Sequence, residues 1–283
     1  GKMLGCRSRR GKLTKKLMTR VFQKVGSIAL DLVALFGQVG TLFSGVVSAI
    51  ATGKVRWGLV GQQVVRVGIA SQLVVVVTGA FTGAVFAAQA YFKFNELGRG
   101  SATGPVVSVA LCRELGPVLA ALMVTSRVGS AMTAEIGTMR VYEQVDALRS
   151  MGVHPVDYLV VPRMIAMVIS LPILVGEAIG FGILAADLLT VHGFGLPQAW
   201  FRHQVILATS AGDLLTGLIK GLVFAVLIVL ICRNQGLRTS HGAAGVGKST
   251  TKAVVDTALA ILVVNLGLTL ILNQFLPIVS LSL

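Results

Sequence analysis

Long apolar runs alternate with short polar connections along this chain. Val67 to Phe92 is 26 residues without a charged side chain, and Thr257 to Leu283 is 27. A helix needs about 20 apolar residues to cross a bilayer. The pattern predicts five membrane-spanning helices, at about residues 67–90, 115–135, 164–187, 211–232 and 254–276.

A different pattern precedes the first span. Between residues 12 and 36, apolar side chains recur every three or four positions and basic or polar side chains occupy the other side. This predicts a basic amphipathic helix in a membrane interface, with a soluble helix packed on another domain as the alternative. Residues 37–52 carry a narrow polar stripe and either stay in the interface or dip into the membrane. We expect a basic N-terminal region, residues 1–56, and a transmembrane domain, residues 57–283.

Composition agrees with a membrane protein. Only 13% of the residues are charged and 54% are hydrophobic, whereas a soluble domain has about 25% charged residues. The formal net charge is +14, but 12 of the 25 Lys and Arg precede Val67. That concentration suits the anionic cytoplasmic face of a bilayer, so we expect no nucleic-acid binding.

The same basic residues predict an orientation. With the N-terminus inside, the cytoplasmic stretches 1–66, 136–163 and 232–253 hold 19 Lys and Arg, and the external stretches 93–104 and 188–204 hold three. Basic residues stay on the cytoplasmic side of short connections. The expected fold is an all-α integral membrane protein with its N-terminus inside and its C-terminus outside.

Glycines at helical spacing predict close contacts between spans. Ordinary enrichment of glycine in membrane helices is the alternative for any single pair. The pairs are Gly79 with Gly83, Gly176 with Gly180, and Gly217 with Gly221.

One stretch matches a motif of ATPases. The phosphate-binding pattern G-x-x-x-x-G-K-[ST] is completed by Gly242, Gly247, Lys248 and Ser249. A working loop of this kind joins a buried strand to a helix, but here one predicted span precedes the motif and another follows closely. We interpret the match as coincidental. The glycines are expected to form a turn, and Ser249 to Thr251 to cap the helix that follows.

Three stretches resemble, in this order, the MlaE family of ABC-transporter permeases. They are RELGPVLAALMVTSRVGSAMTAEIGTM (113–139), EQVDALRSMGVHPVDYLVVPR (143–163) and GVGKSTTKAVV (245–255). The resemblance covers about residues 55–276. It implies a non-catalytic permease subunit that moves phospholipids or related lipids between the inner and outer membranes and so maintains outer-membrane lipid asymmetry.

The resemblance also implies partners. Such permeases work as a homodimer in the bacterial inner membrane, between cytoplasmic ATPase subunits that use ATP and Mg. An MCE-domain periplasmic protein and a small STAS-type accessory subunit belong to such systems. No cofactor or metal is expected on this chain itself.

A cytoplasmic coupling helix is implied at about residues 140–155. An ABC permease receives the closure of its ATPase through a short helix docked in an ATPase groove, and a plain amphipathic loop helix is the alternative. The residues that match the family's segment are Glu143, Gln144, Asp146, Ala147, Leu148, Met151 and Gly152.

Five polar residues lie in the predicted spans or at their ends: Arg113, Glu114, Arg127, Lys220 and Asn265. Ionisable groups at membrane depth usually face a cavity or a partner. Glu114 could pair with an arginine, and Arg113 or Arg127 could meet a lipid phosphate, which suits guanidinium geometry. Structural ion pairs are the alternative. The family often has Lys at the position of Lys220, and it commonly has Asp where this chain has Asn265.

Two other functions remain open from the sequence. An ion-coupled secondary transporter or channel would use carboxylates in the spans, such as Glu114, Glu177 or Asp213; Asp187 also falls at the end of a span. A membrane-anchored ATPase would use the phosphate-binding motif. The histidines and cysteines show no metal-ligand spacing.

Overall fold

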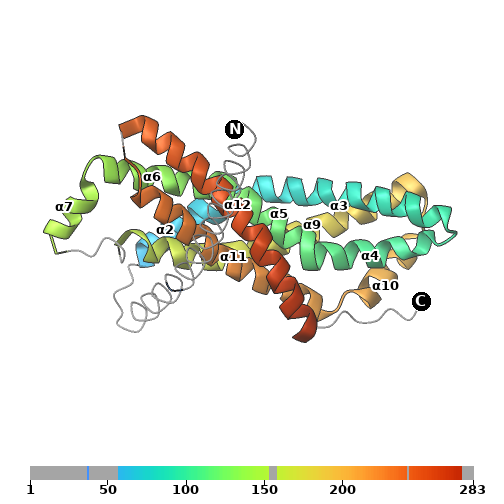
Figure 1. Ribbon diagram of the computed structural model, residues 1–283. Coiled ribbons are helices and arrows are strands. Elements are labelled where there is room, and N and C mark those ends of the chain that lie inside the picture. Colours follow the sequence, from blue (N-terminus) through green and yellow to red (C-terminus); the bar gives the residue numbers. More distant parts are fainter. Residues whose placement is uncertain (1–36, 38–56, 153–157, 241, 276–283) are drawn as a thin grey trace, which may run out of the picture. The chain divides into compact units, whose positions relative to one another are not determined.

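The computed structural model describes Gly37 and residues 57–152, 158–240 and 242–275 (Figure 1). Contacts divide the chain into two units, Gly1–Ala51 and Thr52–Leu283. The second unit contains every described residue except Gly37. The predicted amphipathic helix of residues 12–36 lies outside the described residues.

Five long helical segments make up the second unit, and each is long and apolar enough to cross a membrane. This confirms the five predicted spans, each of which is longer than predicted. The first span comprises α2 (Trp57–Val64), η1 (Val65–Ile69) and α3 (Ala70–Glu96). The second comprises α4 (Thr103–Ala110), η3 (Leu111–Leu115), α5 (Gly116–Val124), η4 (Thr125–Gly129) and α6 (Ser130–Val141). The others are α9 (Val161–Phe194), α11 (Ala211–Leu237) and α12 (Gly242–Phe275).

Short elements connect the spans. The 3-10 turn η2 (Gly100–Ala102) precedes α4, α7 (Gln144–Ser150) follows α6, and α10 (Gln198–Ala208) lies between α9 and α11. In Figure 1, α7 and the start of α12 lie at one end of the bundle, the α7 end, and α10 lies at the other, the α10 end. The charge distribution predicts that the α7 end is cytoplasmic.

Helix α10 was missed, because residues 188–204 were expected to form only an external connection. Its buried Phe201 packs with Val107 and Leu111 of the second span and with Ala186 of α9. A short helix whose apolar positions cover only three turns leaves a weak signal in the sequence.

Glycines set the distance between neighbouring spans. A Cβ atom at Gly83 would lie 2.2 Å from the carbonyl oxygen of Gly182, and one at Gly217 would lie 2.4 Å from that of Cys112. Both positions therefore require glycine, and α3 packs closely on α9. Gly176 and Gly180 differ, because an added Cβ would meet nothing within 4 Å among the described atoms. That predicted pair brings no two described helices together.

The phosphate-loop motif lies inside a helix. Because α12 begins at Gly242, the prediction of a glycine turn capped by Ser249 to Thr251 was wrong. The hydroxyls of Thr250 and Thr251 instead donate to carbonyls four residues earlier, at Val246 and Gly247.

Candidate functional site

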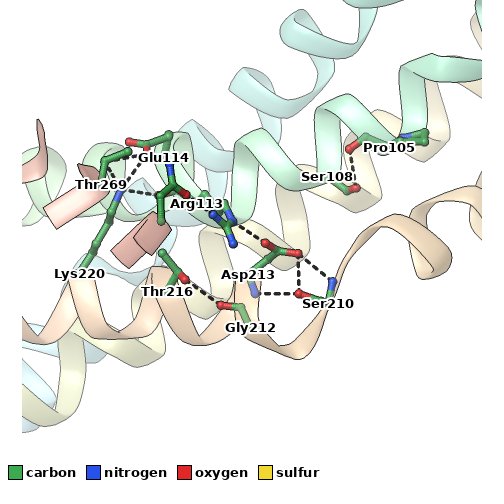
Figure 2. A network of polar contacts seen from close by, with 11 residues as sticks. Pro105, Ser108, Arg113, Glu114, Ser210, Gly212, Asp213, Thr216, Lys220 and Thr269 are labelled. Atoms are coloured by element: carbon green, nitrogen blue, oxygen red, sulfur yellow. Dashed lines mark hydrogen bonds and ion pairs between the residues drawn. The ribbon is translucent and has the colours of Figure 1, made fainter. Parts of the chain in front are cut away.

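A polar network inside the bundle is centred on Arg113 and Glu114 (Figure 2). Pro117 has no N–H to offer the carbonyl oxygen of Arg113 four residues earlier. The adjoining segment η3 is π-helical, and Gly116 donates its N–H to the carbonyl of Leu111. The Nζ atom of Lys220, from α11, donates to this carbonyl of Arg113 at 2.8 Å. The proline thus removes one helical donor from a carbonyl that accepts from a buried cation.

Lys220 is fully buried, with 0% of its side chain exposed. Besides the carbonyl of Arg113, its ammonium donates to Oε1 of Glu114 and to the hydroxyl of Thr269, each at 2.8 Å. An ammonium has three N–H donors, so all three have partners. A buried charge that is paired and fully hydrogen-bonded avoids most of its desolvation penalty.

Glu114 receives further donors from α12. Nδ2 of Asn265 donates to Oε2 of Glu114 at 2.8 Å, and the Thr269 hydroxyl lies 2.8 Å from Oε1. Asn265 and Thr269 are four residues apart and therefore lie on one face of the helix. Glu114 pairs with a lysine rather than with an arginine. Asn265 acts as a neutral donor where an aspartate would bring a further negative charge.

Arg113 forms the second half of the network. Its Nε donates to Oδ1 of Asp213, and its Nη1 to Oδ1 of Asn273 on α12. Asp213 also lies in the first turn of α11, where Oδ2 accepts from the backbone N–H and the hydroxyl of Ser210, both at 2.8 Å. Ser210 and Asp213 form a reciprocal capping box, which satisfies N–H groups at the start of the helix.

The network is balanced in charge. Its two cations, Arg113 and Lys220, face two anions, Asp213 and Glu114. It joins the second, fourth and fifth spans, and each of its four charges faces an opposite charge. Asp213, Thr269 and Asn273 were not predicted as partners, because their separation from Arg113 and Glu114 in the sequence conceals the contacts.

Arg127 lies apart from this network. It belongs to the π-helical segment η4 and lines a pocket of about 250 Å³ together with Arg66, Glu135 and Arg163. These three residues were not predicted as site residues. Glu135 accepts from Arg66 and from Arg163, at 2.6 Å each.

The predicted coupling segment, residues 140–155, is not one helix. Arg140 is the penultimate residue of α6, and Glu143 adopts a left-handed conformation, with φ 56°, before α7 begins. Gly152 has φ 75° just after α7 ends at Ser150. These two left-handed residues therefore bound a helix of seven residues.

Within α7, only Val145 is buried and anchors the helix to the bundle. Asp146 pairs with Arg140 at 2.6 Å and with Arg149 at 3.2 Å. The remaining matched positions are exposed or half-buried: Glu143, Gln144, Ala147, Leu148, Met151 and Gly152.

The other carboxylates of the spans are separate from one another. Asp187 pairs with Arg202 at 2.9 Å, and Glu177 accepts a hydrogen bond from Gln72 at 3.2 Å. Among the described residues, no group of three or more His, Cys, Asp and Glu could hold a metal ion.

Five apolar helical segments, three of them joined through a buried polar network, define a multi-pass helical membrane protein. The permease MlaE family matches residues 60–271, and the chain belongs to this family. Probable ABC transporter permease proteins of Synechocystis sp. and Rickettsia bellii are 40% and 35% identical, over 86% and 88% of this chain and 91% and 96% of theirs. The chain is also 37% identical to the Arabidopsis thaliana protein TRIGALACTOSYLDIACYLGLYCEROL 1, chloroplastic, over 78% of this chain and 63% of that protein.

Proposed function

We propose that this chain is the membrane permease subunit of an ABC transporter that moves phospholipids or related lipids between the inner and outer membranes. Membership of the permease family supports the transporter class. The name of the Arabidopsis relative, which is that of a diacylglycerol lipid, supports the substrate class. The location that follows is the bacterial inner membrane, with the α7 end in the cytoplasm.

The phosphate-loop motif is helical, and this observation supports the proposal that other subunits, not this chain, hydrolyse ATP. A phosphate-binding loop offers free backbone N–H groups to its ligand, whereas in a helix only the first four N–H groups lack a carbonyl partner four residues earlier. The motif occupies the first turns of α12. Gly247, Lys248 and Ser249 lie beyond that free first turn, which supports a non-catalytic chain that takes its energy from separate ATPase subunits using ATP and Mg.

Helix α7 is the surface proposed to receive those ATPase subunits. Tyr142 and Met151, at its two ends, expose 72% and 68% of their surface. Exposed apolar side chains at the tip of a bundle favour a protein partner. Arg140 and Arg149 hold Asp146 between them, which would transmit a push on α7 to α6.

The remaining partners follow from the family resemblance alone. They are a second copy of this chain, an MCE-domain protein on the periplasmic side and a STAS-type accessory subunit. The ion-coupled alternative is weakened, because Glu114 and Asp213 are both held in ion pairs.

The test compares two exposed apolar residues at opposite ends of the bundle. Met151 and Leu97 are matched in exposure, at 68% and 69%. With the cognate ATPase, Met151→Glu is expected to reduce co-purification and ATP-driven lipid transfer between vesicles about tenfold, and Leu97→Glu to leave both unchanged. The permease proposal fails if the chain alone turns over ATP and Lys248→Ala abolishes that turnover.

A further inference from the structure

Two π-helical segments present arginines to one pocket at the α7 end. Arg66 belongs to η1 in the first span, and Arg127 belongs to η4 in the second. Arg163, at the start of α9, completes the set around the pocket of about 250 Å³. Single π-helical turns inside α-helices frequently occur at functional sites.

The pocket has more positive than negative charge. Its one carboxylate, Glu135, gives one oxygen to Arg66 and the other to Arg163. Arg163 is nine-tenths buried and also donates to the carbonyl of Leu159 at 2.7 Å, so it is held firmly. Arg127 makes no side-chain hydrogen bond or ion pair with the part of the chain that the structure describes.

The rest of the lining is mostly apolar. It consists of Val67, Ala70, Val128, Ala131, Met132 and Met167, together with Gln63. A small soluble anion would satisfy the guanidinium groups but would leave these walls in contact with water. An acyl chain alone would leave surplus charge at membrane depth without a counter-ion. An amphiphile with an anionic head satisfies both parts.

We propose that this pocket binds the phosphate group of a phospholipid, with Arg127 as the direct phosphate ligand and the acyl chains against the apolar walls. Arginine suits the role because its planar fork can donate two parallel hydrogen bonds to phosphate. Arg66 and Arg163, fixed through Glu135, supply the surrounding positive potential. The choice of a lipid as ligand rests on the proposed function, and it places the lipid's phosphate in the leaflet at the α7 end, away from the Glu114–Lys220 network.

The experiment measures binding to the full chain, purified alone in detergent, by native mass spectrometry. The probes are a short-chain phosphatidylglycerol, a diacylglycerol with the same acyl chains, and inorganic phosphate. Arg127→Ala is expected to weaken phosphatidylglycerol binding about tenfold or more, because it removes the charge-assisted hydrogen bonds to the phosphate. The affinity of Arg127→Lys for phosphatidylglycerol should lie between those of the intact chain and of Arg127→Ala, because lysine keeps the positive charge but lacks the planar guanidinium group.

The matched control is Arg238→Ala. Arg238 is an exposed arginine that ends α11 at the same end of the bundle and does not line the pocket. It should leave binding unchanged. Diacylglycerol should bind more weakly than phosphatidylglycerol and should not respond to Arg127→Ala.

Two outcomes overturn the proposal: equal effects of Arg127→Ala and Arg238→Ala, or inorganic phosphate that competes as strongly as phosphatidylglycerol, which would show a site for free anions. Because binding is measured without an ATPase, this result is independent of the transport test. If the assembled transporter moves lipid but Arg127→Ala leaves phosphatidylglycerol binding unchanged, the proposed pocket is refuted and the transport function is not. Tight, Arg127-dependent binding without ATP-driven transfer refutes the transport function alone.

Discussion

The two arginine-bearing regions of the second span have opposite designs. Around Arg113, in η3, two cations meet two anions, and the Lys220 ammonium has a partner for each N–H. Around Arg127, in η4, three guanidinium groups line one pocket, and the carboxylate of Glu135 pairs with only two of them, Arg66 and Arg163. Both regions use arginine in a π-helical segment, so residue type and local backbone do not decide the role. The balance of charge does, because a surplus needs a counter-ion from outside the chain.

Removal of one charge from the balanced network should have the largest effect. Lys220→Met leaves Glu114 and the carbonyl of Arg113 without their buried donor, and breaking a buried pair costs about 3–5 kcal/mol. We expect a large fall in the thermal midpoint of the detergent-solubilised chain. The double variant Lys220→Met with Glu114→Gln should recover part of it. An unchanged midpoint in the single variant would mean that the network is not structural.

A substitution that pushes α11 away from the second span should cause the next largest loss of stability. In Gly217→Ala the new Cβ would lie 2.4 Å from the carbonyl oxygen of Cys112, beside Arg113. Overpacking of this kind costs about 1–3 kcal/mol. The control is Gly180→Ala, also in the middle of a span, where a Cβ meets nothing within 4 Å. Thermal unfolding of the two variants side by side measures the difference, and equal midpoints would contradict the packing.

Glu135→Gln changes the pocket in the opposite sense. It removes the carboxylate that pairs with both Arg66 and Arg163, so the surplus of positive charge grows. We expect phosphatidylglycerol to bind a few-fold more tightly, with a loss of stability of about 1 kcal/mol from the lost pairs. Parallel measurements of lipid binding and thermal midpoint separate the two effects. Weaker phosphatidylglycerol binding would show that Glu135 holds Arg66 and Arg163 in position for the lipid rather than only offsetting their charge.

Arg127→Ala should affect stability least. The side chain is exposed and makes no contact of its own to a described carboxylate. Substitutions away from special features usually change stability by less than about 0.5 kcal/mol. A thermal scan should therefore superpose on that of the intact chain while lipid binding falls. If the thermal midpoint of Arg127→Ala fell as far as that of Lys220→Met, Arg127 would be as structural as the balanced network, and the two regions would not differ.

Local sequence could predict some of the site, but not its pairings. The motif around Arg113 and Glu114 marked both residues as special, yet Lys220 lies 106 positions from Glu114 and Asp213 lies 100 from Arg113. No periodicity reports contacts across such separations. Glu135 lies inside one of the stretches that resemble the family, residues 113–139, but its partner Arg66 lies outside all three of those stretches.

The sequence by itself determined the number of spans and the family. Hydropathy sums over consecutive residues, so a run such as Val67 to Phe92 needs no tertiary information to predict a span. Tertiary structure decided which charges are compensated, that α12 begins at the phosphate-loop motif, and that α7 is only seven residues long. The physical reason is the same in each case. Pairing, helix ends and close approach depend on atoms brought together from distant parts of the chain, and their free energies appear only when the helices pack.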